Sequence, residues 1–125
     1  MHIIGKIDIN IYKCVTEDIQ TDEVIITDNQ IAHIKERHPD AYEQFSRFFN
    51  EILQKPDYII EANKPDTAII LKEINVGSQK TKTVLKLAAS SVSSKLSNSI
   101  ITFMKIDDKD WNRLLRNKKI LYKSE

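Results

Sequence analysis

Two histidines, His33 and His38, lie close together in the chain, and Pro39 follows directly. Histidine can both accept and donate a proton near neutral pH, which makes it suited to general acid–base catalysis. Either side chain is therefore a candidate catalytic acid or base. The structural alternative for each is a helix-end histidine that caps backbone carbonyls, or a half-buried histidine of the core.

The spacing of these histidines does not favour a metal site. Zinc-binding helices place two histidines at positions i and i+4, whereas His33 and His38 are five positions apart. On an ideal helix their side chains point about 140° apart. No carboxylate stands where a third ligand is expected, and Cys14 is the only cysteine, which rules out a cysteine zinc cluster and an internal disulfide. We therefore expect no metal and no other cofactor.

A lysine on a predicted strand is the first candidate partner of the histidines. Alternation in the run 82–89 places Leu85 and Leu87 on one face of the strand and Lys86 on the other. If the leucines pack against helices, Lys86 emerges on the opposite side of the sheet. The alternative is an ordinary solvated sheet face.

Two hydroxyl groups on later strands complete the set. In the run 100–106, Ile101 and Phe103 are expected on the core face and Thr102 opposite them, beside Lys86. Tyr122 lies on a short last strand. Such a group suits a phosphodiester: lysine offsets the charge of the pentavalent phosphate, hydroxyls orient it, and histidine moves the proton.

The net charge of +1 hides an asymmetry between the two parts of the chain. Residues 1–71 hold 7 Lys/Arg against 13 Asp/Glu, and residues 72–125 hold 12 against 5. A basic surface for a polyanion is one interpretation, and interleaving of both signs on folding is the other. The basic surface is expected around Lys80, Lys82, Lys86, Lys95 and Lys123.

The elements that must position these residues begin with segment 2–15, which reads as one or two strands. A helix capped by Thr27 or Asp28 follows and ends near His38, because proline disfavours the α conformation at the preceding residue. A second helix begins at Asp40, which has capping-box spacing to Glu43. This helix ends at positions 55–56.

A run of predicted strands follows, at 58–62, 67–74, 82–89 and 100–106, with a Ser-rich loop at 90–99. Asp107 or Asp108 caps a last helix, and 120–123 is a closing strand. Helices segregated from a meander indicate an α+β fold, and the length suits one domain over residues 1–125. The predicted shared core consists of Phe45, Phe48, Ile52, Leu85, Leu87, Ile101 and Phe103.

The composition excludes several classes of protein. Hydrophobic residues make up 41% of the chain and charged residues 30%, which is ordinary for a globular protein and argues against disorder. No window approaches the roughly 20 apolar residues of a membrane helix, and the first residues lack the apolar core of a signal peptide. We therefore expect a cytoplasmic protein with no membrane partner.

Taken together, these segments resemble the phage- and toxin-associated nucleases of the barnase–EndoU–colicin–RelE group. The likeness covers nearly the whole chain. It consists of VIITD at 24–28, I-x-HI-x-x-RHP at 31–39, KPDYI at 55–59, VLKL at 84–87, NSIIT at 98–102 and ILYK at 120–123. The resemblance implies two N-terminal helices packed on an antiparallel sheet of about four strands.

The resemblance also implies a metal-independent ribonuclease that uses the RNA 2′-hydroxyl as nucleophile and leaves a 2′,3′-cyclic phosphate. His33 or His38 would be the base, with His38 preferred because a helix end can face the sheet groove. Lys86 would neutralise the phosphate, Thr102 would hold a non-bridging oxygen, and Tyr122 would orient or protonate the leaving group. The RNA backbone would be gathered by Lys80, Lys82, Lys95 and Lys123.

The expected substrate is single-stranded or loop RNA such as tRNA, because the 2′-hydroxyl must be free to align. The Ser-rich loop would close over it. An immunity or antitoxin protein is the expected partner if the domain is a toxin. The main alternative is a catalytically silent phage or mobile-element module that binds RNA or a protein, and a metal hydrolase is the third.

Overall fold

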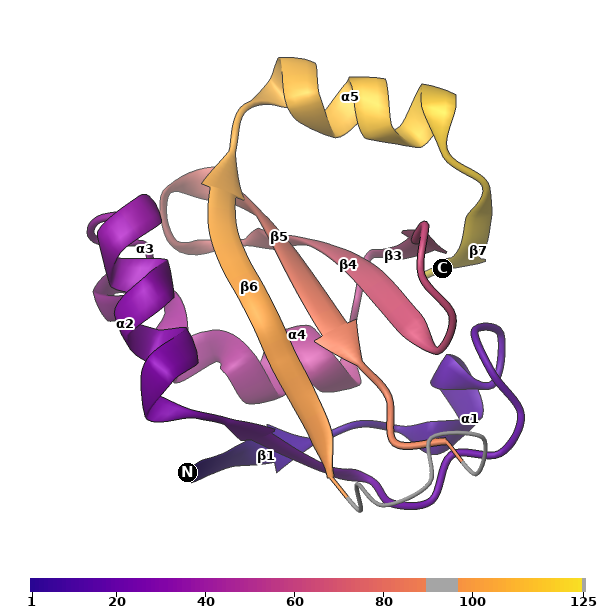
Figure 1. Ribbon diagram of the computed structural model, residues 1–125. Helices are drawn as coiled ribbons and strands as arrows, with labels where there is room; N and C mark the ends of the chain where they lie inside the picture. The colour runs from indigo at the N-terminus through magenta and orange to yellow at the C-terminus, as the bar shows by residue number, and fades with distance from the viewer. Residues whose placement is uncertain (90–96, 125) are drawn as a thin grey trace.

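Strands from both ends of the chain join the central meander in a single mixed sheet (Figure 1). The computed structural model describes residues 1–89 and 97–124. Within them the strands are β1 His2–Lys6, β2 Glu23–Ile26, β3 Tyr58–Glu61, β4 Thr67–Ile74, β5 Gln79–Lys86, β6 Asn98–Ile106 and β7 Ile120–Lys123. Their order across the sheet is β1-β2-β6-β5-β4-β3-β7.

The α+β class is confirmed, but the expected sheet of about four strands is wrong: the described residues form seven. The four-stranded meander β6-β5-β4-β3 is antiparallel, as expected. β2 extends it by parallel pairing with β6, and β7 extends it at the other edge by pairing with β3. Such pairings join segments far apart in the chain, so the local pattern of apolar residues does not reveal them.

The helices are α1 Ile9–Tyr12, α2 Asp28–Arg37, α3 Ala41–Phe45, α4 Phe49–Gln54 and α5 Asp108–Asn117, with short 3₁₀ turns η1 Ser46–Phe48 and η2 Val76–Ser78. In Figure 1, α2 and α3 lie beside β6, α4 lies behind the sheet, and α5 spans its upper end. We call the face that packs on α4 the inner face, and the opposite face the outer face.

The prediction of one or two strands over residues 2–15 is only half correct. β1 ends at Lys6, and α1 follows where a second strand was expected. The Asp8 carboxylate accepts a hydrogen bond of 3.0 Å from the backbone N–H of Asn10 and so caps α1. The buried Tyr12 hydroxyl then donates to the carbonyl of Leu53 at 2.8 Å. Local capping and one tertiary contact outweigh the β-branched composition of this segment.

The helix that carries the histidines is confirmed. Thr27 caps it, and Thr27 and Gln30 bond reciprocally at 3.2 Å in a capping box. The capping box predicted at Asp40 is wrong, because Asp40 has a φ of 73° and makes no side-chain cap. Its left-handed backbone reverses the chain after Pro39. The helix predicted beyond it is broken into α3, η1 and α4.

The core lies between the inner face and the helices. Phe45 and Phe49 pack edge-to-face on Phe103, with ring centroids 6.2 and 5.0 Å apart. Phe48 is half-buried against this cluster. Ile101 is not in the core, since it is 41% exposed. A register shift in β6 opposite β5 inserts an extra residue, so Ile100 turns inward in its place.

Truncation of the central aromatic side chain should be costly. Phe49 is 1% exposed and contacts two other rings, so Phe49→Ala should lower the free energy of unfolding by about 3–5 kcal/mol. Ile101→Ala is the matched control and should change it by less than about 1 kcal/mol, because the side chain is already exposed. Urea unfolding followed by circular dichroism measures both. Equal losses would contradict this description of the core.

Candidate active site

A row of cationic and hydroxyl side chains crosses the open part of the outer face. In β5, Lys82 and Lys86 alternate with the inward residues Thr83 and Leu85. The two lysines are four residues apart, about 13 Å along a strand. Thr102 of β6 pairs with Val84, which lies midway between the lysines, so the hydroxyl group shares their face. The strand register therefore agrees with the predicted outward orientation of Lys86 and Thr102.

Lys86 is held at one side of a hollow on this face. Its ammonium donates to the carbonyl of Pro65 at 2.9 Å. The hollow has a volume of about 490 Å³, and its lining is mainly apolar, including Val84 and the displaced Ile101. An ammonium has three protons, so Lys86 keeps donors for a second oxygen, such as that of a phosphate.

Helix α2 brings further cations alongside β6. The Ser99 hydroxyl at the start of β6 donates to the side-chain carbonyl of Gln30 at 3.3 Å, which fixes the first turn of α2 to the sheet. Gln30, His33 and Arg37 fall within about 60° of one another around the helix. His33 and Arg37 are exposed, while Ile34 packs into the core. Gln30, His33 and Arg37 therefore lie along one side of α2, from the anchored first turn toward the end of the helix.

His38 is the C-cap of α2 and is half-buried. Its backbone N–H donates to the carbonyl of Ile34 at 2.7 Å. Its side chain lines a hollow of about 240 Å³ between the α2–α3 turn and Lys105 of β6. Burial lowers the pKa of His38 below its ordinary value, and the charges of Arg37, His33 and Lys82 lower it further. The fold therefore favours the neutral imidazole, which is the form that accepts a proton.

The lowered pKa of His38 can be measured directly. We expect its imidazole to titrate below 6.5 when the ring proton shifts are followed by NMR against pH. Lys82→Met should raise that pKa, because removal of a nearby positive charge makes protonation easier. Lys109→Met, an exposed change on α5, is the control and should leave it unchanged. A value above 6.5 in the unaltered protein would contradict this description.

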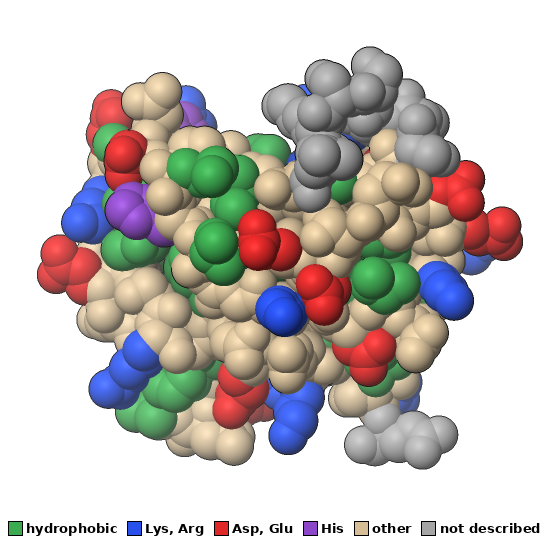
Figure 2. All heavy atoms as spheres, turned by 90° about the horizontal axis from the view of Figure 1, so that it is seen from below, with side chains coloured by type: hydrophobic (Ala, Val, Ile, Leu, Met, Phe, Trp, Pro, Cys, Tyr) green, Lys and Arg blue, Asp and Glu red, His purple; other side chains and the backbone are tan. Residues whose placement is uncertain are grey.

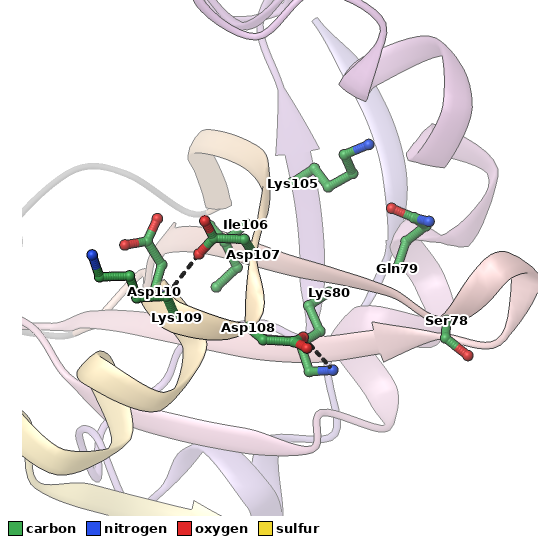
Figure 3. A pocket seen from close by; sticks show the side chains of 9 residues that line it. All are labelled: Ser78, Gln79, Lys80, Lys105, Ile106, Asp107, Asp108, Lys109 and Asp110. Atoms are coloured by element: carbon green, nitrogen blue, oxygen red, sulfur yellow. Dashed lines mark hydrogen bonds and ion pairs between the residues drawn. The ribbon is translucent and has the colours of Figure 1, made fainter.

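Lys80 lies near the other end of β5, and its ammonium forms ion pairs with carboxylates there. Its ammonium is 3.0 Å from the Asp108 carboxylate and 3.9 Å from that of Glu73, and it sits over the ring of Trp111. Figure 3 shows Lys80 and Asp108 pointing at each other in the hollow at the N-terminal end of α5. Asp107 and Asp110 line the same hollow. The ammonium of Lys80 is thus paired with carboxylates, so we exclude Lys80 from the candidate site.

Two residues proposed from the sequence lie away from the row. Tyr122 pairs with the buried Ile59 and packs against the core on the inner face, so it cannot reach a phosphate on the outer face. Lys123 pairs with Tyr58 in β3. β7 is three strands from β5, about 14 Å. Lys95 and the central part of the Ser-rich loop lie outside the described residues.

The remaining candidates form two separate groups. The hollow beside Lys86 and the hollow beside His38 share no lining residue. Lys82 lines neither hollow, but its charge acts on His38. The sequence interpretation did not include Gln30 and Arg37, which share one side of α2 with His33, among the candidate site residues. Their spacing to His33, i−3 and i+4 on a capped helix, was the signal that could have found them.

Charge on one further face of the molecule is mixed. Figure 2 shows acidic and basic side chains interspersed on the underside of the molecule as drawn in Figure 1. In residues 1–89 and 97–124, no three His, Cys, Asp or Glu side chains converge in a way that could hold a metal ion. Across the same ranges, no helix is both long and apolar enough to cross a membrane.

The fold and the site define an α+β protein with lysine and threonine side chains along one sheet face and a histidine-bearing helix beside β6. The chain belongs to the family described as phage-Barnase-EndoU-ColicinE5/D-RelE like nuclease 2, whose model matches residues 1–123. The resemblance predicted from the sequence motifs is therefore confirmed. No curated protein and no solved structure matches the chain significantly.

Proposed function

We propose that this member of a nuclease family is a metal-independent endoribonuclease that cuts RNA by attack of the 2′-hydroxyl and leaves a 2′,3′-cyclic phosphate. The observation that carries the proposal is the row of Lys82, Thr102 and Lys86 on an open sheet face beside the histidine-bearing helix. Cations there favour the phosphate backbone. A fixed cation also stabilises the charge that grows on the phosphate oxygens.

The chemical roles follow from position and protonation. His38 is the general base that removes the 2′-hydroxyl proton, because its lowered pKa keeps the imidazole neutral at lower pH. His33 delivers a proton to the leaving 5′-oxygen. Lys86 neutralises the phosphate, Thr102 donates to a non-bridging oxygen, and Lys82 aligns the chain of the substrate. As pH falls through the lowered pKa of His38, the base is lost and the rate should fall with it.

The substrate class that fits this face is single-stranded or loop RNA, with tRNA among the candidates, because an unpaired nucleotide can align its 2′-hydroxyl in line with the bond that breaks. We propose a cytoplasmic setting and one catalytic domain. If the protein is a toxin, an immunity or antitoxin protein that covers the outer face is its natural partner.

A second function is favoured by one observation. The hollows that hold His38 and Lys86 share no lining residue, as expected for a catalytically silent RNA-binding module that uses its cations alone. A simple expression experiment distinguishes the two functions. Expression of an active ribonuclease should be toxic to a bacterial host, with His38→Ala relieving the toxicity, whereas the silent module gives no such difference.

The direct test uses purified protein with end-labelled single-stranded RNA in excess EDTA, and DNA of matched sequence beside it. We expect cleavage of the RNA at discrete positions and none of the DNA. Activity that EDTA abolishes and added Mg²⁺ restores would instead indicate metal-dependent hydrolysis. Binding of RNA without cleavage, at any protein concentration, would favour the silent module.

A further inference from the structure

The hollow beside Lys86 has walls that differ from the rest of the outer face. Adjacent strands contribute Ile69 from β4, Val84 from β5 and Ile101 from β6, and together they form an apolar floor. α5 covers a neighbouring part of this face with Trp111 and buries Leu71 there. Ile69 is 9% exposed in the same Trp111 cluster and Val84 packs against it, so Ile101, at 41% exposed, is the most open part of the floor. Apolar surface and the proposed phosphate site thus lie side by side.

The β-bulge in β6 places Ile101 in the apolar floor of the hollow. Regular pairing would put Ile101 opposite Leu85 and turn it into the core, but Leu85 pairs with Ile100. The extra residue aims Ile101 out of the sheet, where it is 41% exposed and lines the hollow. Exposure of a large aliphatic side chain has a cost in water. Bulges of this kind commonly re-aim a side chain at a functional site.

The polar rim of the hollow is fixed in place. Pro65 accepts hydrogen bonds of 2.9 Å from both the Lys86 ammonium and the Thr67 hydroxyl. The Asn63 side-chain carbonyl accepts from the ammonium of Lys118 at 3.2 Å. These contacts pin the β3–β4 loop, whose Asn63 and Lys64 line the rim. A preformed rim lowers the ordering cost of binding.

We propose that this hollow is a subsite for one unpaired nucleobase of the RNA. The inference rests on the proposed function and specifies where the nucleotide beside the reacting phosphate is held. A nucleobase has apolar faces that suit Ile101 and Val84, and polar edges that suit the amide of Asn63. Its phosphate carries the negative charge that Lys86 complements. The volume of about 490 Å³ lies within the range of small-ligand sites.

The test measures whether binding depends on the base and on Ile101. A labelled 2′-O-methyl RNA pentanucleotide, which the proposed chemistry cannot cut, is compared with versions that lack one base at each position in turn. We expect removal of one particular base to weaken binding about tenfold in fluorescence anisotropy. Ile101→Ser should abolish that difference, because it removes the exposed apolar side chain of the floor. The control Val76→Ser changes an exposed aliphatic residue outside the hollow and should preserve it.

Each outcome separates the subsite from the catalytic proposal. Equal binding of all the abasic versions overturns the subsite, whether or not the protein cuts RNA. A base-dependent difference that survives Ile101→Ser also overturns it. A surface meant for a protein partner would give the first of these results. Base-dependent binding that Ile101→Ser abolishes supports the subsite even in a preparation that cleaves nothing.

Discussion

Replacement of His38 by alanine should reduce RNA cleavage by about 10²–10⁴-fold, the usual loss when a general base is removed. The loss should fall mainly on kcat, because the imidazole acts on the 2′-hydroxyl rather than on binding of the RNA backbone. The side chain is only half-buried at the end of α2, so the fold should persist. Single-turnover cleavage of labelled RNA measures the effect, with circular dichroism to check folding.

His2→Ala is the matched control for the loss at His38. His2 is an exposed histidine whose ring contacts Asp28 at 2.6 Å at the start of α2, at the opposite end of that helix from His38. Its removal should leave the cleavage rate within about twofold of the unaltered protein. Full activity in a His33→Ala/His38→Ala double variant would contradict histidine catalysis outright.

The second large effect is expected at Lys86. Lys86→Met keeps the aliphatic stem in the hollow and removes the charge, so it should lower kcat by about 10²–10³-fold, as loss of one stabilising donor does at other sites. It should also make RNA affinity less dependent on salt, because one contact with phosphate is lost. Cleavage rates and binding measured at two or more salt concentrations give both quantities.

Lys109→Met is the control for Lys86. Lys109 belongs to α5 and lines the separate hollow of Figure 3, where carboxylates gather. Its loss should change neither the rate nor the slope of affinity against salt. If Lys86→Met cleaved RNA as fast as Lys109→Met, the assignment of the phosphate to the outer face would be wrong.

The elements that could be predicted from the sequence are those with strong local signals. Helices α2 and α5 are each capped by one of their two predicted candidates, Thr27 and Asp107, and β4 has the predicted bounds. α1 could not be predicted, because its strand-like composition is overridden by the Asp8 cap and by burial of Tyr12 beneath α4. The pairing of β2 with β6 joins segments more than 70 residues apart, and local periodicity carries no information about it.

The same distinction applies to the candidate site. Simple alternation was sufficient to place Lys86 on the outer face. It failed at Ile101, because one inserted residue reverses the phase of the strand. It also could not show that Lys80 is paired with Asp108, a contact between two elements. The opposite faces of Tyr122 and Lys86 follow from the register of the whole sheet.

The measurement that tests the central claim most directly is the chemistry of the cut ends. RNA is incubated with the protein in excess EDTA, beside the same RNA carrying a single 2′-O-methyl group at the cleaved nucleotide. The account predicts a 2′,3′-cyclic phosphate on the upstream product and a 5′-hydroxyl on the downstream one, with no cut at the methylated nucleotide. Cleavage at that nucleotide, or a 5′-phosphate on the downstream product, would contradict it.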